Sequence, residues 1–359
     1  MSWRGLAALM SIAVLSYGAV LAQGDDESDT SLFNSSVVSA EAMPRAGESM
    51  LLDVATTGSG LVAVGERGHI LRSTDGDSWE QVADVPTRST LTAVFSLGDR
   101  VWAAGHDQVI VHSADGGQSW QRQYASPDVF DPEANSPLLD IFFLDEQRGF
   151  AVGAYAVFLR TSDGGQSWEV ASLELADDVE DEGASEEDDA AAANDPYAYD
   201  DFDIGVDYHL NGMTQLDDGT LYIAAEQGNG YRSSDDGETW QELVLPYGGS
   251  MFGAVTLAQD QLLTYGLRGN AFISVDAGGS WQQLDTDSLN SLNGAVQLGS
   301  GEVVMVGVNG EVLVLADNQI RSLELAEGND IAAVVAVDSG LVMVGEGGSW
   351  RYPLEQVLQ

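Results

Sequence analysis

The sequence predicts an all-β fold, a seven-bladed β-propeller built from four-stranded antiparallel blades. The first observation is a short motif in which a Ser or Thr, an Asp, a Gly and a Trp recur in the same order, as in residues 113–120 (SADGGQSW). The second is that each copy lies between the third and fourth of four short apolar runs. The third is the spacing of about 40 residues between equivalent runs, which is the length of a propeller blade.

The motif, called the box below, is typical of a tight turn between two strands. Its Asp can accept backbone N–H bonds inside the turn, its Gly can adopt a positive φ, and its Trp opens the next strand. Five copies are present, the first of them shortened by one residue. We therefore predict a structural role for Asp75, Trp79, Asp115, Gly117, Trp120, Asp163, Gly165, Trp168, Asp235, Gly237, Trp240, Asp276, Gly278 and Trp281.

Seven units follow when the chain is aligned on the first apolar run of each. The predicted first strands begin at Leu51, Leu91, Leu138, Leu210, Met251, Leu292 and Ile331. The sixth unit, residues 292–325, keeps its strands but has no box, and the seventh, residues 331–354, ends before a fourth strand. We expect residues near 34–42 to supply that N-terminal strand and close the last blade, because closure hides exposed sheet edges.

The first residues have the features of an export signal. Arg4 precedes an apolar stretch at residues 6–15, and Val20-Leu21-Ala22 fits a cleavage site, so residues 1–22 are predicted to be a signal peptide. A retained membrane anchor is the alternative, but the apolar stretch is short for a span. Residues 23–33 are predicted to be a flexible leader and residues 34–359 the propeller. We expect a periplasmic or secreted protein with no membrane span after signal removal.

The composition excludes several classes of partner. The chain has 58 acidic and 13 basic residues and a formal net charge of −45, and every basic residue is an arginine. Such a surface repels nucleic acid and anionic membranes. Adaptation to a salty environment and a specific basic partner are both compatible with this charge. The absence of cysteine excludes disulfides and thiol chemistry.

Two insertions interrupt the repeat. Residues 124–137 contain three prolines and are expected to form an ordered loop. Residues 173–208, between blades 3 and 4, form an acidic insertion that we expect to be partly disordered. Its aromatic residues Tyr197, Tyr199 and Phe202 could either dock a partner or fold back on the blades. Asp200, Asp201 and Asp203 have the chemistry of calcium ligands, although their spacing matches no standard loop.

The topology of a four-stranded meander separates two faces. The boxes lie on one face, and the turns between second and third strands lie on the other with both insertions. Loops on a rigid scaffold usually carry function, so this turn face is the predicted binding surface. Its candidate residues, besides the three aromatic residues of the insertion, are Arg67, His69, His106, Tyr155 and Arg268.

These candidates allow more than one role. An exposed Arg67 or Arg268 could receive a carboxylate from a partner or neutralise the protein's own acidic insertion. His69 and His106 lie beside Glu66 and Asp107, a donor set that is chemically adequate for a metal. Because adjacent blades spread their turns around the rim, we expect neither a metal nor a cofactor.

The residues also carry a family resemblance. The box resembles the Asp-box, or bacterial neuraminidase repeat. With its Gly-x-x-Gly turns and the lead-ins Arg72-Ser73, Arg160-Thr161 and Arg232-Ser233, the repeat resembles the propellers of the photosystem II stability and assembly factor family over nearly the whole mature chain. The resemblance implies assembly or stabilisation of membrane complexes, with an arginine-rich patch that binds partners. Exported members in non-photosynthetic bacteria accompany exporters of the resistance-nodulation-division (RND) type.

We therefore expect a non-catalytic propeller, monomeric on its own, that scaffolds an envelope membrane complex through its insertion-bearing face, with an RND-type exporter as the partner. A photosystem II assembly factor is the alternative. A sialidase-like glycosidase would need three clustered arginines, a Tyr nucleophile with a Glu partner, an acidic proton donor and an Arg-Ile-Pro motif, whereas Met43-Pro44-Arg45 has those letters in the wrong order. A glycan-binding propeller is a third alternative, but most Trp residues belong to the boxes.

Overall fold

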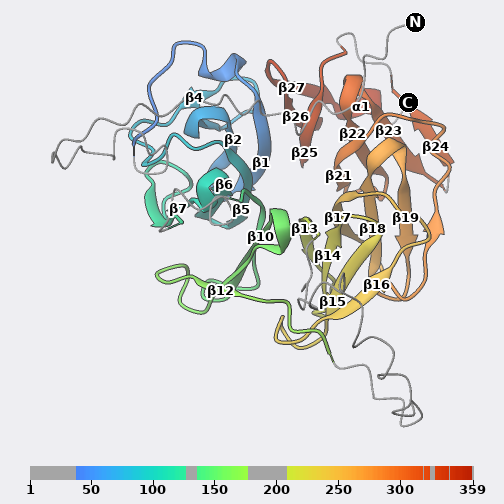
Figure 1. The fold of residues 1–359 in the computed structure, drawn as a ribbon. Helices are drawn as coiled ribbons and strands as arrows, with labels where there is room; N and C mark the ends of the chain where they lie inside the picture. The colour runs from blue at the N-terminus through green and yellow to red at the C-terminus, as the bar shows by residue number, and fades with distance from the viewer. Residues whose placement is uncertain are drawn as a thin grey trace, which may run out of the picture.

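The structure is a computed structural model that describes residues 38–126, 136–176, 208–317, 319–323, 328–338 and 340–357. Seven antiparallel sheets follow one another in chain order, and the inner strand of each packs against the inner strand of the next. Figure 1 shows the last sheet lying beside the first, so the ring is closed by packing. The predicted seven-bladed propeller is confirmed.

The strands of the first four blades have the following bounds. Blade 1 contains β1 (Leu51–Thr57), β2 (Gly60–Gly65), β3 (Ile70–Ser73) and β4 (Glu80–Gln81). Blade 2 contains β5 (Leu91–Leu97), β6 (Arg100–Gly105), β7 (Ile110–Ser113) and β8 (Gln121–Tyr124). Blade 3 contains β9 (Leu138–Phe143), β10 (Gly149–Gly153), β11 (Phe158–Thr161) and β12 (Glu169–Ala171). Blade 4 contains β13 (Leu210–Gln215), β14 (Leu221–Ala225), β15 (Asn229–Ser233) and β16 (Gln241–Val244).

The last three blades complete the ring. Blade 5 contains β17 (Met251–Leu257), β18 (Gln261–Gly266), β19 (Ala271–Ser274) and β20 (Gln282–Gln283). Blade 6 contains β21 (Leu292–Gln297), β22 (Val303–Gly307), β23 (Val312–Ala316) and β24 (Gln319–Ser322). Blade 7 contains β25 (Ile331–Val337), β26 (Gly340–Gly345) and β27 (Gly348–Pro353), followed by the short helix α1 (Leu354–Val357). All seven inner strands begin at the residue that the sequence predicts.

The core lies between the blades. The second strand of each blade, such as β10 with the sequence GFAVG, is buried along its whole length because neighbouring sheets cover both of its faces. The box tryptophans fill the outer part of these interfaces. Trp240 of blade 4, for example, is 1% exposed and contacts Phe158 of blade 3 edge to face, with ring centroids 5.9 Å apart. Each box thus joins its own hairpin to the preceding blade.

The arginines that precede the boxes join the same interfaces from the other side. Arg72 of blade 1 donates from Nε to the carbonyl oxygen of Gly116, in the box of blade 2, at 3.0 Å. Arg160 of blade 3 lies 3.6 Å from the carboxylate of Glu238, in the box of blade 4. The Arg-Ser/Thr lead-in therefore has a physical explanation, since its side chain reaches the box of the next blade.

The seventh blade differs from the prediction. Its sheet holds three strands in the described part of the chain, and residues 38–42 form no strand. Blade 1 binds them instead, because Gln81 donates from Nε2 to the Glu41 carbonyl and Arg88 donates from Nε to the Ser39 carbonyl. These bonds satisfy carbonyl groups that a strand ladder would otherwise use. The predicted closing strand is therefore wrong for residues 38–42, and residues 34–37 lie outside the described residues.

The acidic insertion has its two ends at different places. At the start of the insertion, Glu174 accepts the backbone N–H of Trp240 with its carbonyl oxygen, and Ala176 donates its N–H to the Trp240 carbonyl. The departing chain therefore extends the edge of blade 4 beside a box. After it, the Tyr208 carbonyl accepts the N–H of Ala156, on the turn face. The prediction that the insertion emerges from the turn face holds for its return but is wrong for its departure, because the departing chain pairs with the backbone of Trp240, the residue just before β16. Residues 177–207 lie outside the described residues.

Candidate functional site

The turns between second and third strands share one geometry. Five of them are short 3₁₀ turns, namely η4 (Glu66–Gly68), η5 (His106–Gln108), η6 (Ala154–Ala156), η8 (Leu267–Gly269) and η9 (Val308–Gly310). In all seven blades, the first turn residue donates its N–H to the carbonyl just before the inner strand of the same blade. These pairs are Glu66 and Met50, His106 and Thr90, Ala154 and Pro137, Glu226 and His209, Leu267 and Ser250, Val308 and Ser291, and Glu346 and Asp330.

The tips of these turns form a ring of displayed side chains. Six turns hold a non-glycine residue with φ between 54° and 59° at the tip, which are Arg67, Asp107, Tyr155, Gln227, Arg268 and Asn309. A side chain in this left-handed region costs on the order of 1 kcal/mol or more and is often kept for function. All but Asp107 are exposed. We call these six residues the tip ring.

The predicted turn-face residues differ in how far the structure exposes them. Arg67, Tyr155 and Arg268 belong to the tip ring and are exposed, whereas His106 precedes a tip and is half-buried. His69 follows its turn and is 0% exposed, so the prediction that it lies on the binding face is wrong. Its side chain is buried because only the central residue of each turn points outward. This burial lowers the pKa of His69. Tyr197, Tyr199 and Phe202 lie outside the described residues.

The two tip arginines make few contacts with the described part of the propeller. Arg67 donates from Nη1 to the sulfur of Met43 at 3.8 Å, and the Arg268 backbone N–H donates to the hydroxyl of Ser291 at 3.4 Å. Among the residues that the structure describes, no carboxylate forms an ion pair with either guanidinium. Whether these charges neutralise the acidic insertion stays a prediction, because residues 177–207 lie outside the described residues.

An aromatic cluster beside Tyr155 was missed by the sequence reasoning. The ring of Tyr155 contacts His209 edge to face at 4.9 Å, and His209 Nδ1 lies 3.5 Å from a Glu226 carboxylate oxygen. His209 is two residues beyond the undescribed part of the insertion, so no repeat position marked it. With Tyr155 64% exposed, this cluster gives the turn face an aromatic contact point between blades 3 and 4.

The box carboxylates accept most of their hydrogen bonds within their own turns. Asp235 accepts hydrogen bonds from the Thr239 hydroxyl at 2.7 Å, the Thr239 N–H at 2.9 Å and the Ser233 hydroxyl at 2.7 Å. These bonds lower the pKa of Asp235 to about 2. The indole N–H of Trp240 donates to the Gly237 carbonyl, which ties the following strand to the turn. Three of the roughly four acceptor positions of the Asp235 carboxylate are thus used within its own turn.

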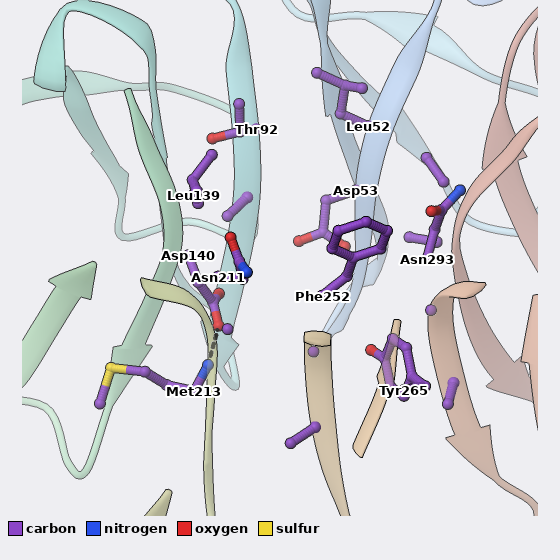
Figure 2. A pocket seen from close by; sticks show the side chains of 18 of the residues that line it. Leu52, Asp53, Thr92, Leu139, Asp140, Asn211, Met213, Phe252, Tyr265 and Asn293 are labelled. Atoms are coloured by element: carbon purple, nitrogen blue, oxygen red, sulfur yellow. Dashed lines mark hydrogen bonds between the residues drawn. The ribbon is translucent and has the colours of Figure 1, made fainter. Parts of the chain in front are cut away.

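A cavity of about 200 Å³ lies in the channel at the turn-face end of the inner strands. Figure 2 shows that Leu52, Leu139 and Phe252 line it together with the polar residues Asp53 and Asp140. It is reached between the first residues of each inner strand, which begin on the turn face. The cavity therefore lies at the same end of the inner strands as the tip ring.

Asp53 and Asp140 each join two blades. The Asp53 carboxylate accepts the N–H of Val54 in its own strand and the N–H of Val94 in blade 2, both at 2.8 Å. Asp140 accepts from Ile141 at 2.8 Å and from Met213 of blade 4 at 2.6 Å. Burial nevertheless raises the pKa of Asp53 to about 7 and that of Asp140 to about 6, because desolvation outweighs these bonds.

In the described ranges no three His, Asp or Glu side chains come together as metal ligands. In the same ranges, no helix is long and apolar enough to cross a membrane.

Comparison with known proteins identifies similar propellers. The family model described as photosynthesis system II assembly factor YCF48 matches residues 35–131 and 123–185. The structure of YCF48 from Cyanidioschyzon merolae is 16% identical with a TM-score of 0.62, over 88% of this chain and 98% of that one. The structure described as YCF48 bound to D1 peptide is 15% identical with a TM-score of 0.61, over 88% and 99%.

A propeller of another kind is also similar. The WD40 propeller domain of Doa1 is 10% identical with a TM-score of 0.58, over 87% of this chain and 94% of that one. At these identities the solved structures show the fold alone. No curated protein matches the chain.

Proposed function

Since the family-model match and the confirmed fold support a photosystem II assembly factor-like β-propeller, we propose that this chain is a non-catalytic scaffold whose turn face holds a segment of a membrane protein complex during assembly. The observation that carries the proposal is the tip ring, in which Arg67, Tyr155 and Arg268 are exposed in a costly backbone conformation, and in which neither arginine has an ion-pair partner among the described residues. Their rigid turns preorganise the surface for binding.

The chemistry of the face favours binding over catalysis. The box carboxylates are occupied by their own turns, and the two tip arginines lie in blades 1 and 5 rather than in a cluster. A sialidase-like reaction requires clustered arginines around a Tyr nucleophile and its Glu. A guanidinium and an exposed aromatic ring are instead the side chains that contribute most to protein interfaces.

The partner that we propose is an envelope exporter of the RND type, reached by an exported protein. The support is the resemblance of the signal-like residues 1–22 and of the repeats to exported members of the family. A photosystem II complex is the second candidate, and the specific observation in its favour is the similarity to the YCF48 that is bound to a D1 peptide.

Affinity capture separates these candidates. The full chain, tagged at its C-terminus, is used to capture complexes from detergent-solubilised membranes of the source organism. Recovery of a large transporter supports the exporter, and recovery of photosystem subunits supports the second candidate. Arg67→Ala and Arg268→Ala should reduce recovery, whereas Arg100→Ala, which removes a surface charge paired with Glu146, should not. Recovery of no membrane protein, or equal recovery with all three variants, would overturn the proposal.

A further inference from the structure

The channel cavity is lined by two carboxylates that have no ion-pair partner in the described part of the chain. Asp53 lies on β1 and Asp140 on β9, and both side chains face the cavity (Figure 2). Their negative charges reinforce one another, since Asp140 contributes to the raised pKa of Asp53. No arginine in the described ranges forms an ion pair with either carboxylate, and the chain contains no lysine. Carboxylates removed from bulk water without a cation are costly, so a cation that entered this cavity would be stabilised.

A buried hydroxyl points into the same space. Tyr265 is 7% exposed, lines the cavity and directs its hydroxyl toward it (Figure 2). The hydroxyl oxygen accepts from the Ala295 N–H. Burial raises the pKa of this phenol, and the charges of Asp140 and Asp53 raise it further. A buried, neutral hydroxyl thus lines the same cavity as the two carboxylates.

The remaining lining residues and the volume of the cavity indicate which kind of cation would fit. Leu52, Leu139 and Phe252 are apolar, and the amides of Asn211 and Asn293 already donate to the carbonyls of Met251 and Ile331. A volume of about 200 Å³ is far larger than a metal ion and matches an aliphatic stem with a charged head. Each carboxylate also uses lone pairs on two backbone N–H groups, which leaves too few oxygen ligands for a calcium or magnesium shell.

We propose that this cavity is a binding site for an ammonium or guanidinium group on an aliphatic stem, supplied by a Lys or Arg side chain of the segment that docks on the turn face. The head group would lie between Asp53 and Asp140, and its stem would lie against Leu52, Leu139 and Phe252. The identity of the source rests on the proposed function. The cation site itself is tested without the partner, so failure of one can be distinguished from failure of the other.

Calorimetric titration of the full chain in about 0.15 M salt tests the site, because this salt screens binding to the acidic surface. The probes are the N-acetyl N-methylamides of lysine, arginine and norleucine, together with calcium chloride. We expect lysine or arginine to bind with a stoichiometry of one and norleucine not to bind. Equal binding of norleucine would show an apolar pocket only, and binding of calcium alone would show a metal site, and either result would overturn the proposal.

Variants locate the binding. The double variant Asp53→Asn with Asp140→Asn should weaken the affinity for the cationic probe by about thirtyfold or more, because it removes the carboxylate charges that the bound cation would face. These substitutions also disturb blade contacts, so Ala332→Met is the second variant, which fills the cavity and keeps both carboxylates. It should block binding with an unchanged melting temperature. Asp285→Asn, at an exposed position, is the matched control and should bind normally. Unchanged binding by Ala332→Met would overturn the proposal.

A further arm distinguishes the source of the cation. A blocked pentapeptide with lysine between two glycines on each side is compared with spermidine. Tighter binding of the peptide supports a side chain of a docked segment. Tighter binding of spermidine would assign the cavity to a free amine and would overturn the proposed source.

Discussion

Arg351 of β27 forms an ion pair with Asp77 in the box of blade 1, with 2.5 Å between Nη1 and the carboxylate oxygen. Arg351 thereby links the last blade to the first, much as Arg72 links blade 1 to the box of blade 2. Because no fourth strand joins blade 7 in the described part of the chain, this ion pair replaces part of the sheet pairing that we expected to close the ring.

The closing ion pair gives the first prediction. Arg351→Gln should lower the free energy of unfolding by about 0.5–1 kcal/mol, because the pair is only partly shielded from solvent. About 1 M salt should remove most of that difference. Chemical denaturation at low and high salt measures both. Arg45→Gln, which breaks an exposed pair with Glu48 inside one turn, is the control, and an equal loss in the two variants would contradict a special role in closure.

The box carboxylates predict the response to acid. Asp235→Asn should cost about 1–2 kcal/mol at neutral pH, because hydrogen bonds from Thr239 and Ser233 are lost. The folded pKa of Asp235, about 2, lies below its unfolded value, so the stabilisation is present above pH of about 4 and is lost as the pH falls through 2. Denaturation at a series of pH values should therefore show the difference between wild type and variant shrinking in acid. A constant difference would argue against this origin.

The burial of His69 leads us to predict a second, smaller dependence of the protein's stability on pH. Burial lowers its pKa in the folded protein, so the neutral ring is favoured and the stability is lost as the pH falls below its unfolded value of about 6.5. Val109 and Val157 occupy the equivalent position in blades 2 and 3. His69→Val should therefore flatten the decline in stability between pH of about 7.5 and 5.5, as followed by thermal melting. A decline as steep as that of the wild type would show that other groups cause it.

The turns predict opposite effects of two small substitutions. Gly68 has a positive φ, and a Cβ there would lie 2.2 Å from the Thr87 carbonyl oxygen in the link to blade 2. Gly68→Ala should therefore destabilise the protein by about 2 kcal/mol or more. Ala156 occupies the same position with φ of 55° in blade 3, where the link carries the acidic insertion. Ala156→Gly should be neutral or stabilising by up to about 1 kcal/mol. Equal effects of the two changes in denaturant unfolding would contradict this account.

The repeat explains why so much of the fold could be predicted. Each first strand begins at the expected residue because a blade offers one register that buries its second strand on both faces. The predicted closing strand was wrong for residues 38–42, where Gln81 and Arg88 donate to two of the carbonyl groups, and side-chain bonds of this kind leave no periodic pattern.

The site was harder to predict because its residues break the repeat. Asp53 and Asp140 occupy the third position of inner strands where the other blades have Ala or Gly, and that contrast was the available signal. His69 and Arg67 are two residues apart, yet only the latter is exposed, because the left-handed φ of the central residue turns it outward. His209 follows an insertion that belongs to no repeat, so only its contact with Tyr155 revealed it.

The central claim is that the turn face binds the partner. Site-specific photo-crosslinking tests it most directly, with p-benzoylphenylalanine placed either at Tyr155, 64% exposed in the tip ring, or at Val275, 72% exposed in a box on the opposite face. After irradiation with solubilised membranes, we predict a crosslinked membrane protein from position 155 and none from position 275. A product from position 275 alone would contradict the claim.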